Sequence, residues 1–126
     1  MAPNPQILKW FRSHGARFRH AALTARPLDS APDVASWVLR HFGTWIRTFG
    51  VVPTRFAESE PVYDRNKVEY LQWFRSGNIL VDDSMENIWQ AEQLGLKALL
   101  YPQPWNNSTL SNAKLLRTLG EWAEVS

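Results

Sequence analysis

The sequence predicts an α/β fold, a three-layer sandwich built on a small, mainly parallel sheet, in one domain that covers residues 1–126. The first observation behind this prediction is that segments with helical spacing of apolar residues alternate along the chain with short apolar runs. The second is the length, because 126 residues can bury one sizeable core but not two. The third is the aromatic content of 13%, with seven tryptophans, which is typical of a packed globular body.

The first half of the chain contains the expected elements in the order helix, strand, helix. Residues 5–14 have apolar side chains at helical spacing, and Gly15 is a natural stop. The run "FRHAALT", residues 18–24, is expected to be a buried strand. Ser30 and Pro32 suit a helix start, and the following apolar residues keep the rhythm of an amphipathic helix as far as Ile46, with Gly43 as a point where it could be interrupted: Val34, Trp37, Val38, Phe42, Trp45 and Ile46.

The second half repeats the alternation after a short strand expected at residues 55–57, which Pro53 would confine to a sheet edge. The remaining predictions follow from apolar spacing, with Gly95 as a helix stop. They are a helix over 66–75, a strand over 78–82, a helix over 84–94, a strand over 97–101 and a last helix over 112–123.

Several classes of protein are not favoured by the composition. No apolar run approaches the roughly 20 residues that a membrane-spanning helix needs, so no membrane partner is expected. The first residues lack the features of a secretory signal, so we expect a cytoplasmic location. The absence of cysteine excludes disulfides, thiolate metal sites and cysteine nucleophiles. His14, His20 and His41 do not have a metal-ligand spacing, and no G-x-S-x-G elbow is present.

The formal charge of +2 is small but unevenly distributed. All the basic residues of the first quarter precede the first acid, Asp29; they are Lys9, Arg12, Arg17, Arg19 and Arg26. A nucleic-acid surface is one interpretation, and steep salt dependence would be its signature. Because the imbalance over the whole domain is small, the sequence favours a solvated helix face and strand edge, and it does not favour nucleic acid as a partner.

Three short stretches end or lie at the carboxyl edge of the predicted parallel sheet, where ligands collect in such folds. In "LTARP", Thr24 closes a strand where a hydroxyl and the next backbone N–H groups could hold an anionic oxygen, although a strand-end threonine is more often structural. In "RNK", Lys67 begins a helix, which is the poorer end for a cation and so weakly favours a functional charge. In "VDDS", Asp82 and Asp83 could bind Mg²⁺; the alternative is that Asp83 and Ser84 cap a helix.

Taken in this order, "LTARP", "RNK" and "LVDDSMENIWQAEQLGLKALLYPQPWN" resemble motifs two, three and four of the haloacid dehalogenase (HAD) superfamily, nearest to its small 5′-nucleotidase-like phosphatases. The resemblance spans residues 16–124, and the third segment is its most specific part. It implies a Rossmann-like core without a cap domain. It also implies that Thr24, with Ala25 and Arg26 beside it, and Lys67 bind the phosphoryl group, and that Asp82 and Asp83 hold Mg²⁺, one of them through water.

The chain departs from this family in one respect that concerns the chemistry. The family's first motif, two aspartates one residue apart, supplies the nucleophile and the general acid, and no Asp-x-Asp occurs in this sequence. Asp29 and Asp33, the nearest candidates, come after the second motif. Without an attacking carboxylate there is no aspartyl-phosphate intermediate, so we assign no catalytic residue. The expectation is a non-catalytic domain that binds a phosphate-bearing small molecule or another protein.

The strand that carries this first motif in the family would lie in the middle of the sheet, between the strands of motifs two and four. Without it, the flanking strands could close on each other into one sheet of about four strands, which is the simplest outcome. Otherwise a second chain inserts a strand, or two copies pair at their edges. The expected partner is therefore another copy in a homodimer or a complementing protein chain. In the alternative function, such a strand, or an upstream segment, completes a Mg²⁺-dependent phosphohydrolase.

Overall fold

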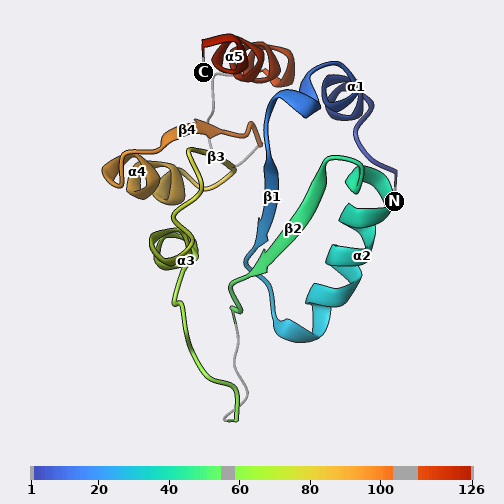
Figure 1. The fold of residues 1–126 in the computed structure, drawn as a ribbon. Coiled ribbons are helices and arrows are strands. Elements are labelled where there is room, and N and C mark those ends of the chain that lie inside the picture. The colour runs from blue at the N-terminus through green and yellow to red at the C-terminus, as the bar shows by residue number, and fades with distance from the viewer. Residues whose placement is uncertain (1, 55–58, 104–110, 126) are drawn as a thin grey trace. The chain divides into compact units, whose positions relative to one another are not determined.

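The structure, a computed structural model, describes residues 2–54, 59–103 and 111–125 (Figure 1). These residues form two compact units, residues 1–70 and residues 71–126, and the boundary falls inside a helix. The elements are α1 (Pro5–His14), β1 (His20–Thr24), α2 (Ala31–Phe42), β2 (Ile46–Val51), α3 (Lys67–Trp73), β3 (Ile79–Asp82), α4 (Met85–Gln93), β4 (Lys97–Leu100) and α5 (Asn112–Val125). Single-turn 3₁₀ helices follow α1 and precede α2.

The first unit begins with α1, whose start is fixed by its cap. The side chain of Asn4 accepts hydrogen bonds from the backbone N–H groups of Gln6 and Ile7, at 2.9 and 3.3 Å, and Pro5 occupies the first helical position. Trp10 is buried on the inner face of the helix. The helix ends at His14, as the sequence predicts.

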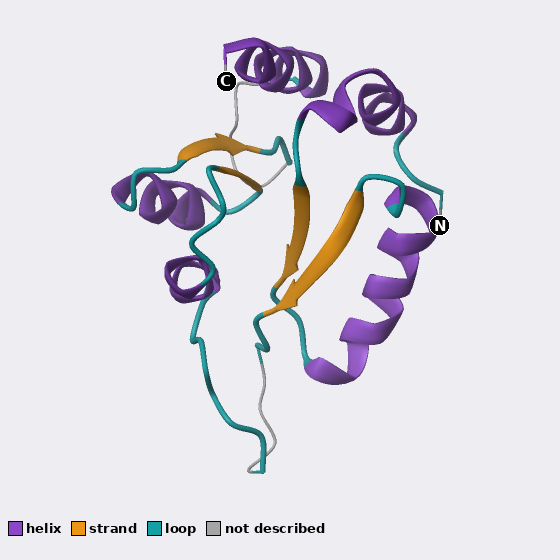
Figure 2. Cartoon of the chain, in the orientation of Figure 1, coloured by secondary structure: helices purple, strands orange, loops and turns teal. Residues whose placement is uncertain are grey.

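In the first unit, β1 and β2 form a parallel two-stranded sheet, connected by α2 (Figure 2). The register pairs Leu23 with Gly50 and Thr24 with Val51. The sequence prediction was wrong here, because it extended the helix to Ile46 and did not expect a strand at Ile46–Val51. Trp45 and Ile46 continue the helical spacing, but the helix ends at Phe42 with Gly43 at its C-cap, and the β-branched residues beyond it form the strand. Residues 55–57 lie outside the described residues.

Aromatic rings from four segments of the first unit form a cluster at the end of the sheet where both strands begin. Phe11 of α1 is its centre, with ring centroids 4.8 Å from His20 of β1, 5.2 Å from Phe42 of α2 and 5.5 Å from Trp45. Trp10 stacks on Phe18 at 6.0 Å. The cluster therefore joins α1, the end of α2 and the starts of β1 and β2.

The second unit contains a β–α–β arrangement in which β3 and β4 pair in parallel. Leu80 of β3 packs with Ile88 and Ala91 of α4 to form a small core, which Leu71 and Leu96 extend; Ala98 and Leu100 of β4 also pack against it. Burial of such side chains stabilises a fold by about 25 cal/mol per Å² of apolar surface. The predicted strand and helix in this region are confirmed to within one or two residues at each end.

Helix α4 ends in a Schellman motif, which fixes the turn into β4. The N–H of Gly95 donates to the carbonyl of Glu92 at 3.0 Å, and the N–H of Leu96 donates to the carbonyl of Ala91 at 3.1 Å. Gly95 has a φ of +88°, in the region that glycine adopts without a steric penalty. The predicted helix stop at Gly95 is thereby confirmed.

Farther along the unit, Leu115 of α5 is buried, and the ammonium of Lys97 lies 5.2 Å from the ring centroid of Trp122.

The structure confirms a mixed α/β fold with parallel strand pairing, and the expected single sheet of about four strands is not seen. Within the described part of the chain, β1 pairs only with β2, and β3 pairs only with β4, in two separate sheets. None of the described helices has the length and apolar character needed to span a bilayer. Trp73 of α3 is 74% exposed, whereas Trp45 is half-buried in the aromatic cluster.

Candidate functional site

The residues expected to hold a phosphoryl group lie in the first unit, and three of them occupy one loop at the carboxyl end of β1. Thr24 is the last residue of β1, and its carbonyl accepts a hydrogen bond from the N–H of Val52 at 2.8 Å. This backbone bond fixes the strand end. Ala25 and Arg26, which follow directly, are both exposed to solvent. The loop can thus offer a hydroxyl, amides and a positive charge to an anion.

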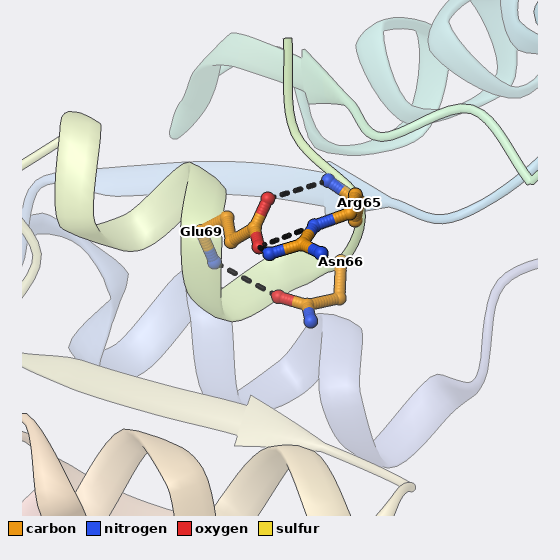
Figure 3. A network of polar contacts seen from close by, with 3 residues as sticks. All are labelled: Arg65, Asn66 and Glu69. Carbon is orange, nitrogen blue, oxygen red and sulfur yellow. Dashed lines mark hydrogen bonds and ion pairs between the residues drawn. The ribbon is translucent and has the colours of Figure 1, made fainter. Parts of the chain in front are cut away.

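The fourth of these residues, Lys67, is the first residue of α3, as the sequence predicts. The residues around it form the network shown in Figure 3. The side chain of Asn66 accepts from the N–H of Glu69 at 2.9 Å, and the carboxylate of Glu69 accepts from the N–H and the Nε of Arg65, each at 2.9 Å. Arg65 and Asn66 of the "RNK" stretch therefore cap the helix and hold its first turn in place.

The Arg65–Glu69 ion pair at 2.8 Å has an electrostatic consequence for this helix start. Hydrogen bonds from Arg65 lower the pKa of the Glu69 carboxyl, and the same interaction raises the pKa of the Arg65 guanidinium. Glu69 thus stays ionised in the first turn of α3, where the helix dipole favours an anion. Lys67 occupies the position where that dipole disfavours a cation.

The strands and α3 are brought together in this unit by a contact that the sequence reasoning missed. A Cβ atom placed on Gly50 would lie 2.5 Å from the hydroxyl oxygen of Tyr70, so the phenol packs directly against the backbone of β2. Gly50 is the register partner of Leu23, one residue before Thr24. The contact therefore places the side chain of Tyr70, from α3, against the strand that pairs with β1. A glycine inside a strand is a signal of such close approach.

The two candidate metal ligands lie in the second unit, where the structure assigns one of them a clear local role. Asp82 ends β3 and is 7% exposed. Its Oδ1 accepts from the N–H of Ser84 at 2.9 Å and from the side-chain amide of Asn87 at 3.4 Å. The hydroxyl of Ser84 accepts from the N–H of Asn87 at 3.4 Å and caps α4. Ser84 thus caps the helix as the alternative interpretation held, but Asp82 supports the turn in place of Asp83, which is half-buried.

The chemistry of Mg²⁺ decides how well Asp82 and Asp83 could hold that ion. Mg²⁺ is commonly bound by one or two carboxylates together with waters and substrate phosphates, so two adjacent aspartates at a strand end fit in ligand type. Within the described ranges, no group of three or more His, Cys, Asp or Glu side chains is arranged to hold a metal ion.

The histidines, to which the sequence assigned no catalytic role, lie among aromatic rings. The Nε2 of His20 lies 2.8 Å from the carbonyl of Gly15 and donates to it. His14 has its ring centroid 5.8 Å from that of Trp10, and the His41 centroid lies 5.0 Å from that of Trp37.

Comparison of the chain with known protein families, with curated proteins and with solved structures found no match.

Proposed function

We propose that this chain is a HAD-like domain that binds a phosphate-bearing ligand without hydrolysing it, and that it does so as a homodimer. The observation that carries the proposal is the loop Thr24–Arg26. It lies at the end of a strand that is fixed by the Thr24–Val52 backbone bond, and it contains a hydroxyl, two exposed residues and a guanidinium. Lys67 begins the helix whose Tyr70 packs on Gly50 of β2, and we infer that it supplies a second cation.

The non-catalytic part of the proposal is supported by the chemistry of the residues present. Phosphoryl transfer through a covalent intermediate needs an attacking carboxylate held beside the phosphorus atom. The sequence contains no Asp-x-Asp pair that could supply a nucleophile and a general acid in the manner of the resembled family. A cationic loop without an adjacent nucleophile can bind a phosphomonoester and leave its ester bond intact.

The test is calorimetric titration with inorganic phosphate and with phenyl phosphate. Wild type should bind, and Arg26→Gln and Thr24→Val should each weaken binding by about tenfold, as expected for the loss of a charge-assisted hydrogen bond of about 1.5 kcal/mol. Arg75→Gln, which removes an exposed arginine of the second unit, is the matched control and should bind as wild type does. Equal affinities in all four proteins would contradict the assignment. Light scattering should give the mass of a dimer.

A second candidate function is a Mg²⁺-dependent phosphohydrolase completed by a strand from another chain or from an upstream segment. The observation that favours it is a difference between the strands in the residues that protect exposed sheet edges. Among the described residues β1 and β3 each have one partner, and neither contains the lysine, arginine or proline that protects exposed edges. β2 contains Arg47 and is followed by Pro53, whereas β4 contains Lys97 and is followed by Pro102. By sequence, β1 and β3 resemble interior strands.

This second candidate has its own test. An in-frame upstream segment that carries an Asp-x-Asp after an apolar strand should give a product that hydrolyses aryl phosphates with Mg²⁺. The activity should be lost on Asp83→Ala in a protein that remains folded. If the extended product is as inactive as the chain itself, the phosphohydrolase interpretation fails, whereas the binding proposal keeps its own readout in the titration.

A further inference from the structure

A group of exposed basic side chains surrounds the aromatic cluster of the first unit. Each lies within two residues of a ring of that cluster, so all six belong to segments that the ring contacts hold together. All of these side chains are exposed to solvent. This set, called the basic end below, consists of Lys9 and Arg12 on α1, Arg17 and Arg19 before β1, Arg40 in the last turn of α2 and Arg47 at the start of β2.

The structure, and not the order of residues in the sequence, assembles the basic end. Arg40 and Arg47 are distant in sequence from α1, but contacts of Phe11 with Phe42 and Trp45 bring their segments to it. Figure 1 shows α1, the end of α2 and the starts of β1 and β2 at the same end of the sheet. Arg26, which the sequence analysis grouped with the N-terminal bases, instead follows the opposite end of β1.

No acidic residue compensates these charges within the segments that carry them. Residues 1–28 and 34–57 contain no aspartate or glutamate. Asp33 lies in the first turn of α2 and Arg40 in its last turn, so most of a helix separates that acid from the basic end. At about 1.5 Å per residue this is roughly 10 Å, about one Debye length at physiological ionic strength. These stretches of sequence therefore contribute positive charge to this end without acidic residues of their own.

One of these cations is held in place before any ligand binds. The Nε of Arg47 donates to the carbonyl of Gly43 at 3.3 Å, and its Nη2 donates to the carbonyl of Thr44 at 2.9 Å. A guanidinium has five N–H donors, so further donors remain for an external anion. Fixing the fork in this way reduces the side-chain entropy that binding would otherwise cost.

We propose that the basic end binds the phosphate backbone of a nucleic acid. Repeated phosphates are the polyanion that an arginine-rich surface suits best, because the planar guanidinium binds phosphate oxygens in pairs, and all but one of these cations are arginines. An anionic membrane suits it less well. Peripheral anchoring needs several exposed apolar side chains, and on the described parts of α1 and of the end of α2 Leu39 is the one large exposed hydrophobic.

The test is fluorescence anisotropy of a labelled single-stranded RNA and a labelled DNA duplex, each of about 25 nucleotides or base pairs, with sodium chloride varied from about 50 to 250 mM. Wild type should bind at low salt, with a slope of log affinity against log salt of about −4 for the RNA and about −5 for the duplex if some six phosphates are contacted. Lys9→Gln/Arg12→Gln/Arg40→Gln should reduce the magnitude of that slope by about 2 and weaken binding at least fivefold at low salt.

The control variant removes the same number of positive charges from the second unit. Lys114→Gln/Arg75→Gln/Arg117→Gln replaces one exposed lysine and two exposed arginines, and it should bind RNA as wild type does. Arg26→Gln should also retain RNA affinity, which separates this proposal from the phosphate-binding loop. Both triple variants should keep the urea midpoint of wild type, because all the replaced side chains are exposed.

Several results would overturn the proposal. The first is that wild type does not bind at the lowest salt, and the second is that the two triple variants weaken binding equally. The third is displacement of RNA by polyglutamate at the same charge concentration, which would indicate an acidic protein partner instead. Flotation with phosphatidylserine vesicles in the absence of RNA binding would likewise replace nucleic acid by a membrane surface. Displacement by a second RNA, and not by polyglutamate, would support it.

Discussion

The phenol of Tyr70 lies against the backbone of Gly50, so closely that a methyl group at that position would be 2.5 Å from the hydroxyl oxygen and 2.6 Å from the ring carbon that bears it. Gly50 is buried in β2, and Tyr70 lies in α3. The contact therefore fixes the helix that begins with Lys67 on the strand that pairs with Thr24. It accounts for a glycine in the interior of a strand, where glycine is otherwise unfavourable.

Replacing this glycine should disturb the contact between α3 and β2. We expect Gly50→Ala to lower the free energy of unfolding by about 1–3 kcal/mol, because ring and backbone must move apart to admit a methyl group. The measurement is the urea midpoint. Gly77→Ala is the control, since its Cβ would meet only a side-chain atom of Leu71 at 3.9 Å, an ordinary van der Waals distance. Equal midpoints for the two variants would show that the close contact is absent.

The cap of α3 should make stability depend on pH. Arg65 lowers the pKa of Glu69, so the folded state binds this proton less readily than the unfolded state does. The stabilisation is therefore present at pH values above the ordinary carboxyl value of 4.5, and it is lost as the pH falls through the lower folded value. Glu69→Gln should reduce the urea midpoint at pH 7, and its difference from wild type should shrink toward pH 3.

The control for the pH series is Glu121→Gln, an exposed glutamate of α5. It should leave the midpoint near that of wild type at every pH. A Glu69→Gln difference that stays constant from pH 7 to pH 3 would show that ionisation of this carboxyl does not stabilise the helix start. Because both Arg65 and Glu69 are accessible to solvent, raising the salt concentration should also reduce the difference.

Two adjacent aspartates should respond differently to the same substitution. Asp82→Ala removes the buried carboxylate that accepts hydrogen bonds from the N–H of Ser84 and the side-chain amide of Asn87. In the absence of metal, this should lower the free energy of unfolding by about 1–3 kcal/mol. Asp83→Ala should cost clearly less, because the hydrogen bonds to Ser84 and Asn87 at the turn are made by Asp82. The measurement is chemical denaturation in the presence of a chelator. A larger loss for Asp83→Ala would mean that the roles are reversed.

The end of α4 depends on the backbone conformation of Gly95, which has a φ of +88°. Apart from Gly95 and its two neighbours in the chain, no atom of the described residues lies within 4 Å of the place that a methyl group on its Cα would occupy. Gly95→Ala should therefore destabilise the protein through conformation alone, by about 1–2 kcal/mol. Gly95→Asn should cost less, since asparagine tolerates the left-handed region. Thermal unfolding of the two variants provides the comparison, and identical losses would indicate that packing, not φ, is what the substitution disturbs.

Local patterns predicted much of this fold. Helix α1, helix α4 with its stop at Gly95, and the apolar strand ending at Asp82 follow from spacing and capping that act within a few residues. The segment 43–51 was assigned wrongly because Trp45 and Ile46 fit a helical period as well as a strand. Whether they continue the helix is decided by the cap at Gly43 and by pairing with β1, which is distant in sequence and leaves no local signal.

The candidate site was predictable only in part, for a related reason. Strand ends and helix starts identify Thr24, Lys67 and Asp82, because turn and cap residues carry local signals. The contact of Tyr70 with Gly50 and the gathering of Arg40 and Arg47 beside α1 depend on tertiary packing. Counting charges along the chain therefore grouped Arg26 with the wrong end of the sheet, and it underestimated the number of cations in the basic end.

Phosphorus-31 NMR of phenyl phosphate mixed with the chain and Mg²⁺ tests the central claim most directly, since one spectrum reports both binding and hydrolysis. We predict that the phosphomonoester resonance broadens with wild type and not with Arg26→Gln, and that no inorganic phosphate accumulates beyond the protein-free sample. Inorganic phosphate that appears in proportion to wild-type protein, and is lost with folded Asp83→Ala, would contradict the claim that this domain binds phosphate without cleaving it.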